Sequence, residues 1–172
     1  GPGGGPPRRR RAGTAGAGLV KEVLRPAALV GGVRPKHTFT YAANTGLVTQ
    51  ETSPIGTVQT TSVVTNHTYD AKGNRTKTVV DDTTTGKKLK TEWSYNAYGD
   101  VTRVMDPRGH VTVFTYWDTA STYSASGKFR RVAEELHSSN AVTTIGGALT
   151  GYLSAARTWY DVSGRPTKVE GP

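Results

Sequence analysis

The sequence repeats one five-residue pattern, which consists of tyrosine, aspartate or asparagine, two free positions and glycine. An Asp or Asn side chain at the first position of a type I turn bonds to the backbone, and glycine at the fourth position readily takes a positive φ. Each copy therefore predicts a strand that ends in a hairpin turn. The copies are Tyr69-Asp70-Ala71-Lys72-Gly73, Tyr95-Asn96-Ala97-Tyr98-Gly99 and Tyr160-Asp161-Val162-Ser163-Gly164.

Two further segments fit the same turn chemistry. The segment Tyr41-Ala42-Ala43-Asn44-Thr45-Gly46 is a looser copy with one extra residue. The segment Asp106-Pro107-Arg108-Gly109 lacks the tyrosine, but its proline stands at the second turn position, where the fixed φ of proline is favourable. We therefore predict a turn at 106–109 as well.

A second regularity lies just before the tyrosines, where a ring, a small hydroxyl residue and tyrosine follow one another. Because successive side chains of a strand point to opposite faces, both rings of each triplet should share one face of a sheet. The triplets are Phe39-Thr40-Tyr41, His67-Thr68-Tyr69, Trp93-Ser94-Tyr95 and Phe114-Thr115-Tyr116.

Alternating residues resume after the glycines, so consecutive turns predict an antiparallel meander and a mainly β fold. The clearest hairpins pair 91–95 with 101–105, and 101–105 with 111–116. The rhythm fails over 119–157, which we interpret as an irregular insertion, and it resumes at Trp159-Tyr160. Within the insertion, residues 130–136 fit either a strand or one short helix.

The first 35 residues differ in composition from the rest of the chain. They hold nine glycines, five prolines, seven basic residues and one acidic residue, which accounts for +6 of the formal net charge of +9. Few apolar side chains offset the entropy of ordering such a segment, so we expect 1–35 to be disordered and 36–172 to form the β region. Arg8, Arg9, Arg10 and Arg11 could contact a polyanion by charge alone, because no aromatic residue is interleaved with them.

Composition excludes several classes of protein. There is no cysteine, which removes disulfide scaffolds, cysteine-based zinc sites and thiol nucleophiles. The most apolar stretch, 19–33, is interrupted by Lys21, Glu22, Arg25 and Pro26, so we expect no membrane span and see no targeting signal. The chain starts without methionine, and we interpret it as a piece of a longer protein.

A search for catalytic chemistry finds no complete motif. The sequence has no metalloprotease, nucleophile-elbow or phosphate-loop signature, and turns already explain Asp70, Asp106 and Asp161. The four histidines fall singly, and only Glu134, Glu135 and His137 cluster. We therefore expect no enzyme, no cofactor and no metal site.

The tyrosine turns carry a family resemblance. Tyr69 to Asn74 and Tyr160 to Arg165, set among threonine-rich strands, look like the YD repeats of the Rhs family, which the B/C components of Tc toxins and the teneurins share. The resemblance covers roughly 39–170. It implies a large β-sheet that spirals into a hollow shell around a C-terminal toxin or effector, in an exported or cell-surface protein. The Asp-Pro-x-Gly-Leu signature of that family is not assigned here, because His110 follows Gly109.

Two functional hypotheses follow. The first is a non-catalytic segment of such a scaffold, whose partners are further YD repeats and an effector domain of the same parent chain. The alternative is a cell-surface module that binds carbohydrate or a polyanion through the aromatic rows and nearby cations. Nucleic acid is expected only as a nonspecific contact of the tail. The direction of the rings separates the two hypotheses, since inward-packed rings favour the scaffold and a solvent-facing row favours saccharide binding.

Overall fold

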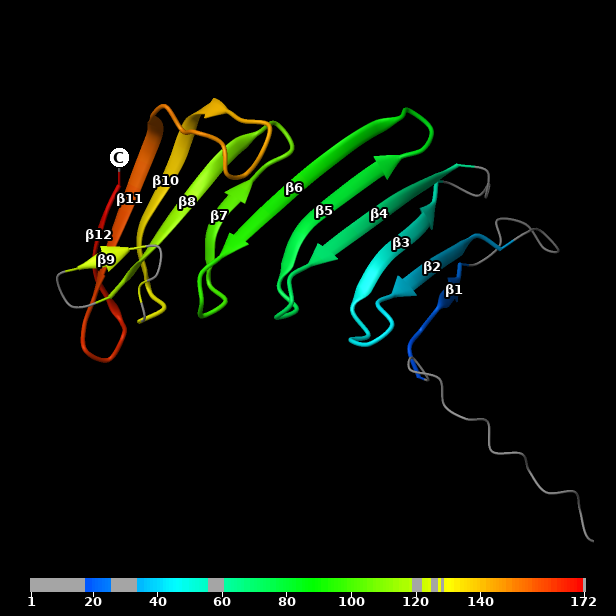
Figure 1. The fold of residues 1–172 in the computed structure, drawn as a ribbon, viewed down its shortest axis with the longest axis horizontal. Coiled ribbons are helices and arrows are strands. Elements are labelled where there is room, and N and C mark those ends of the chain that lie inside the picture. Colours follow the sequence, from blue (N-terminus) through cyan, green and yellow to red (C-terminus); the bar gives the residue numbers. More distant parts are fainter. Residues whose placement is uncertain are drawn as a thin grey trace, which may run out of the picture.

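The computed structural model describes residues 18–25, 34–55, 61–118, 122–124, 127 and 129–171, and within them the protein is all β (Figure 1). The basic run Arg8 to Arg11 lies outside the described residues. The strands are β1 (Glu22–Leu24), β2 (Lys36–Tyr41), β3 (Val48–Pro54), β4 (Ser62–Tyr69), β5 (Arg75–Asp82), β6 (Lys87–Tyr95), β7 (Val101–Met105), β8 (His110–Trp117), β9 (Tyr123–Ser124), β10 (Val132–Ala141), β11 (Tyr152–Tyr160) and β12 (Pro166–Glu170).

These strands form one antiparallel sheet in which neighbours in space are neighbours in sequence. The order runs from β1 to β8 and on through β10, β11 and β12, while β9 pairs with β8 alone, and the sheet does not close on itself. The expected hairpins are confirmed, because Trp93 pairs with Val104 and Val104 with Thr112. The predicted antiparallel meander is therefore the fold of the described chain.

Two expectations are corrected by the structure. The irregular insertion expected over 119–157 contains regular strands, because residues 132–141 form β10, which bonds to both β8 and β11, and residues 152–157 belong to β11. Of the two alternatives for 130–136, the strand is the one found from Val132 onward. Strand β1 lies inside the segment expected to be disordered. It is ordered because the outer edge of β2 offers backbone partners, with Glu22 paired to Thr38 and Leu24 to Lys36.

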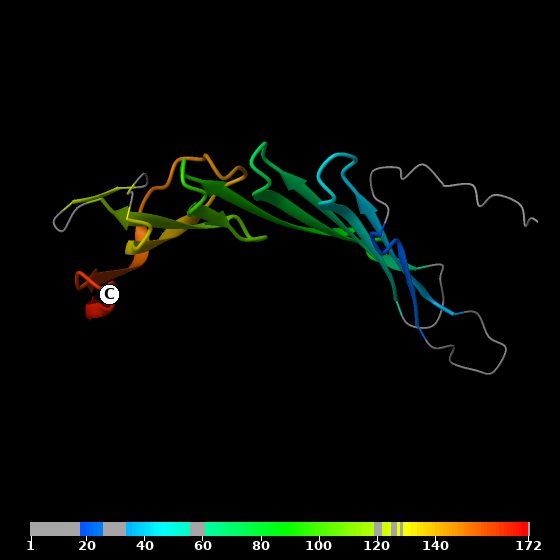
Figure 2. The ribbon, with the colours of Figure 1, turned by 90° about the horizontal axis from the view of Figure 1, so that it is seen from below.

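The sheet is bent into an arch one strand thick, with the loop between β10 and β11 lying over one side (Figure 2). Few side chains are fully buried in such a layer. Among the described residues, buried side chains include Met105, Val111, Tyr116, Trp117, Ala133 and Ser138.

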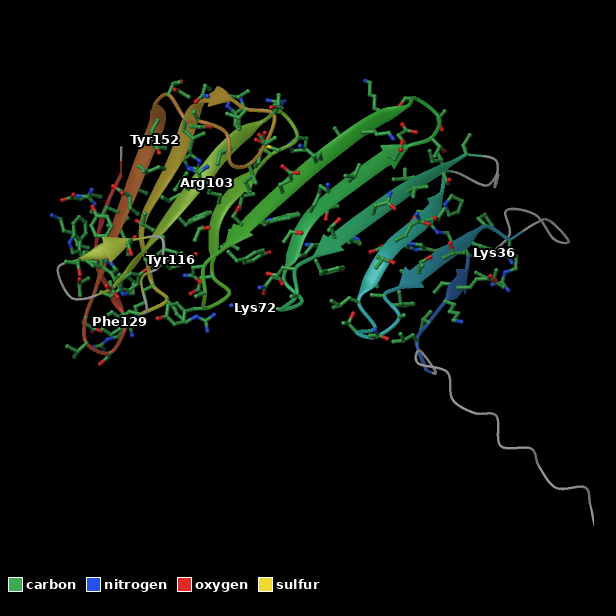
Figure 3. All side chains as sticks on the ribbon, viewed as in Figure 1. Lys36, Lys72, Arg103, Tyr116, Phe129 and Tyr152 are labelled. Atoms are coloured by element: carbon green, nitrogen blue, oxygen red, sulfur yellow. The ribbon has the colours of Figure 1, made fainter. Side chains whose placement is uncertain are left out.

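The loop at 142–151 helps to bury this small core. The Lys90 ammonium donates to the carbonyl oxygen of Thr143 (3.0 Å), and the Arg103 guanidinium donates to that of Ile145 (2.9 Å). Arg103 extends beneath the loop in Figure 3. Because Met105 lies two residues after Arg103 on β7, it points to the same covered face, which explains its burial.

Candidate functional site: the tyrosine turns and the aromatic face

The tyrosine turns gather along one edge of the sheet. The turns that follow β2, β4, β6 and β11 all lie at the lower margin in Figure 1, whereas the turn at 106–109 lies at the opposite margin. This arrangement follows from the meander, in which every second turn falls on the same edge. From β2 to β6 the motif therefore recurs once per two strands along this edge, and it returns after β11.

Each of the three complete copies of the motif has the turn geometry predicted from its sequence. In the first complete copy the Gly73 amide donates to the Asp70 carbonyl (3.1 Å), and the Asp70 amide donates to the Asn74 carbonyl (2.9 Å). Gly73 has a φ of 86°, and the corresponding glycines of the other two copies have nearly the same value. A register shift just before Tyr69 completes a type I turn with a glycine bulge.

The Asx side chain closes the turn from inside. One Asp70 carboxylate oxygen accepts the amides of Lys72 and Asn74, both at 2.9 Å, and the other accepts the Asn74 side-chain amide at 2.9 Å. Asn96 and Asp106 accept the two equivalent amides of their own turns. In the last copy the Asp161 carboxylate accepts the amides of Ser163 and Arg165 and also the Arg165 guanidinium.

These hydrogen bonds favour the ionised carboxylate. The side chain of Asn74, with help from turn amides, lowers the pKa of Asp70 from 3.8, and the backbone amide and guanidinium of Arg165 lower the pKa of Asp161. A carboxylate with a lowered folded pKa adds stability above its ordinary pKa and loses that contribution as the pH falls through the lowered value. The turns are therefore acid-sensitive.

We expect the free energy of unfolding to fall as the pH is lowered below about 4, and to fall less in the Asp70→Asn variant. Asparagine already serves in this position at Asn96, so the substitution keeps the turn while removing the titrating group. Urea unfolding at pH 7, 4 and 3 measures the difference. Equal acid losses in the two proteins would contradict the assignment.

The tyrosine hydroxyls form a series of bonds that the sequence analysis did not predict. Four of them donate to the backbone carbonyl of the residue that starts, or just precedes, the strand before it. Tyr69 on β4 reaches Val48 of β3 (2.7 Å), and Tyr95 on β6 reaches Arg75 of β5 (2.7 Å). The other donors are Tyr41 to Val20 and Tyr116 to Val101, both at 2.5 Å. We call each such junction between consecutive turns a seam.

A packing contact accompanies the hydroxyl bond at the seams. The residue before the accepting carbonyl lies beside the glycine of the next turn, so that the Leu47 side chain is next to Gly73 and the Asn74 side chain next to Gly99. Arg131 lies against Gly164 in the same way. The turn glycine therefore serves both the positive φ and the space that the preceding turn needs.

Replacing Tyr69 by phenylalanine should lower the free energy of unfolding by about 1 kcal/mol, because the half-buried Val48 carbonyl loses its donor while the ring remains. Chemical denaturation of the full chain measures this change. Tyr98→Phe is the matched control, since the Tyr98 ring is 49% exposed at a turn and should change stability little. Equal effects would show that the hydroxyl bond adds nothing.

The two rings of each triplet were predicted to share a face, and the register of the strands places the triplets on one common face of the sheet. Phe39 pairs across the strands with Glu51, and Glu51 pairs with Thr65. Thr65 lies two residues before His67 on β4, so Phe39 and His67 lie on the same face. His67 pairs with Thr78 and Thr78 with Thr91, which extends that face to Trp93. The pairs from Trp93 through Val104 to Thr112 carry it to Phe114 and Tyr116. We call this surface the aromatic face.

Cations cover several of the rings. The Arg75 guanidinium lies 5.1 Å from the centre of the Trp93 ring, and Arg131 lies 5.8 Å from that of Tyr160. The Lys168 ammonium lies 5.0 Å from the Trp159 ring centre on the other face. Cation–π contacts of this kind stabilise a sheet and reduce the ring surface left open to a sugar.

Histidines that appear single in the sequence are brought together by the sheet. His67, with a side chain only 6% exposed, contacts the Glu51 carboxylate through Nε2 (3.1 Å) and Thr78 through Nδ1 (3.0 Å). His37 lies 3.8 Å from the second Glu51 oxygen. These histidines lie far apart in the sequence, and three different strands bring them and Glu51 together.

The cluster at Glu134, Glu135 and His137 is divided between the two faces. His137 contacts Glu135 (3.3 Å), whereas Glu134 binds the Arg157 guanidinium (2.7 Å). Across the described ranges, no group of three His, Asp or Glu side chains could hold a metal ion, and no helix there is long and apolar enough to cross a membrane.

A hollow at the β11–β12 end has a volume of about 370 Å³. Trp117, Arg131, Trp159 and Tyr160 contribute to its wall, together with Phe129, which is labelled at the lower left of the sheet in Figure 3. The Trp117 indole N–H already donates to the Thr158 carbonyl (2.7 Å).

Comparison with known proteins adds no relative, since neither a family model nor a curated protein matches the chain.

Proposed function

We propose that this chain is a non-catalytic structural segment of an Rhs/YD-repeat scaffold, and that it forms part of the wall of a larger spiralling β-shell. In that role its partners are further YD repeats and a C-terminal toxin or effector domain of the same parent chain, exported or at the cell surface. The observation that supports this proposal is that the repeated groups are used within the sheet itself.

The motif residues illustrate this internal use. Hydroxyls of repeat tyrosines donate to backbone carbonyls of the preceding strand, as Tyr69 and Tyr95 do. The turn carboxylates of Asp70 and Asp161 accept amides of their own turns. The hydroxyl bonds hold one repeat to the next and the carboxylate bonds hold each turn, which is what a wall requires. Groups engaged in this way are poorly placed to act on a substrate.

The carbohydrate-binding alternative depends on open ring faces. The rings of the triplets are half-buried in the layer or, at Tyr116, buried, and Arg75 lies over the Trp93 ring. Sugar-binding platforms need a flat ring face that is free of the protein's own cations. The geometry therefore favours the scaffold over the alternative.

Trp93→Ala tests the two functions against each other. The scaffold proposal expects a lower melting temperature and no glycan-array signal for either the wild-type chain or the variant. Lys168→Ala is a control that removes a cation from Trp159 while leaving Trp93 in place. A glycan that binds the wild-type chain and is lost in Trp93→Ala at unchanged melting temperature would overturn the proposal.

The basic run Arg8 to Arg11 gives a separate prediction about polyanions. Binding to heparin, RNA or DNA should be similar, because charge alone recognises the phosphate or sulfate groups. With about four anionic contacts, affinity should fall about 100-fold between roughly 50 and 200 mM salt. Replacing the four arginines by alanine should remove most of it. Salt-resistant, sequence-selective DNA binding by that variant would contradict the scaffold proposal.

A further inference from the structure

The outer edge of β12 repeats the acceptor half of a seam. Pro166 starts β12 and pairs with Tyr160, as Arg75 starts β5 and pairs with Tyr69. The Arg75 carbonyl accepts the Tyr95 hydroxyl of the next strand. By position, the Pro166 carbonyl is the next acceptor in the series.

The residue before that carbonyl, Arg165, bonds to its own turn as Asn74 does in the inner seam. In the inner seam, Asn74 bonds to Asp70 through its side-chain nitrogen and lies beside Gly99 of the next turn through its oxygen. Arg165 occupies the equivalent place, and its guanidinium bonds to Asp161 at 2.8 Å. The turn that ends at Arg165 is thus held in the conformation that a following turn would meet.

Exposed apolar side chains mark the same edge. Among the described strands β12 pairs with β11 only. Val169 is 65% exposed, whereas Val104, which holds the equivalent place on β7, is half-buried beneath its two neighbours. Val162, at the tip of the last turn, is fully exposed. A strand laid along β12 would cover Val169 as β8 covers Val104.

We propose that the outer edge of β12 is a docking site for one antiparallel strand that ends in Tyr-Asx-x-x-Gly. Its tyrosine hydroxyl donates to the Pro166 carbonyl, and its turn glycine lies against Arg165. This inference rests on the proposed scaffold function and names the partner strand by its chemistry. The partner would bind by strand addition, in which backbone hydrogen bonds give the affinity and the positions that receive its side chains give the specificity.

Charge complementarity identifies a suitable probe within the chain itself. In the inner seam Lys77 pairs with Glu92 and Val79 with Lys90. Transferred to β12 in the same register, Glu92 would face Lys168 and Lys90 would face Glu170. Opposite charges on directly facing residues stabilise an antiparallel pair. A synthetic peptide with the sequence of residues 87–100 therefore matches this edge.

The experiment measures binding of that peptide, fluorescently labelled, to the full chain by anisotropy. We expect saturable binding that weakens about fivefold in a Tyr95→Phe peptide, since one hydrogen bond of ordinary strength is lost. A Gly99→Val peptide should also bind more weakly, because its turn no longer fits beside Arg165. A scrambled peptide of the same composition is the control.

A charge reversal locates the site. The Lys168→Glu protein should bind the natural peptide more weakly, and a Glu92→Lys peptide should recover the affinity. No binding, or binding that ignores both Tyr95→Phe and Lys168→Glu, would overturn the docking site. Neither outcome would contradict the scaffold proposal, which the Trp93→Ala experiment tests separately.

Discussion

Replacing Gly109 by valine should destabilise the protein by roughly 3 kcal/mol or more, the largest effect we expect from a single turn substitution. Gly109 has a φ of 89°, which a β-branched residue resists. A Cβ there would also lie 2.5 Å from the Val142 carbonyl oxygen, which belongs to the loop that covers the core. Both the turn and the loop must therefore shift.

Gly99→Val is the matched comparison. Gly99 has a similar φ of 86°, but a Cβ at this position would meet its nearest neighbour, the Asn74 side-chain oxygen, at an ordinary 3.7 Å. It should cost only the backbone strain, about 1–2 kcal/mol. Urea unfolding of both variants gives the difference. Equal losses at the two positions would mean that the contact with the loop is not a constraint.

Met105→Ala should lower the free energy of unfolding by about 2–5 kcal/mol. Met105 is 1% exposed, and it belongs to the small buried cluster with Val111. A single-layer sheet has little other core that can relax into the space, so the loss should lie toward the upper part of that range.

Leu89→Ala is the control for the Met105 substitution. Leu89 also lies on a strand, but its side chain is 54% exposed, so we expect a change of no more than about 0.5 kcal/mol. Thermal unfolding followed by circular dichroism at 218 nm, a wavelength typical of strands, measures both variants. Similar melting temperatures for the two would show that the covered face adds no stability.

The turns could be predicted from the sequence because their chemistry is local. The Asp70 side chain bonds to amides two and four residues ahead, and Gly73 takes its positive φ within the same five residues. The alternation of rings and hydroxyls likewise fixes which side chains share a face. Strand order followed from the short connections between neighbouring hairpins.

The seams could not be predicted because their partners lie far along the chain. Tyr69 and its acceptor Val48 are separated by 21 residues, and no pattern marks a backbone carbonyl as an acceptor. The presence of tyrosine rather than phenylalanine at every copy was the available signal. The His37, Glu51 and His67 cluster was missed for the same reason, since its members come from three strands.

The direction of the seam bonds has a consequence for synthesis. Each of the four seam tyrosines binds a carbonyl that precedes it by 15 to 21 residues, as Tyr116 binds Val101 and Tyr69 binds Val48. The acceptor therefore always leaves the ribosome before its donor, and no seam waits for a distant part of the chain. Short loops of this kind close quickly. The sheet can thus grow during translation one hairpin at a time, with each new hairpin added to an edge that is already in place.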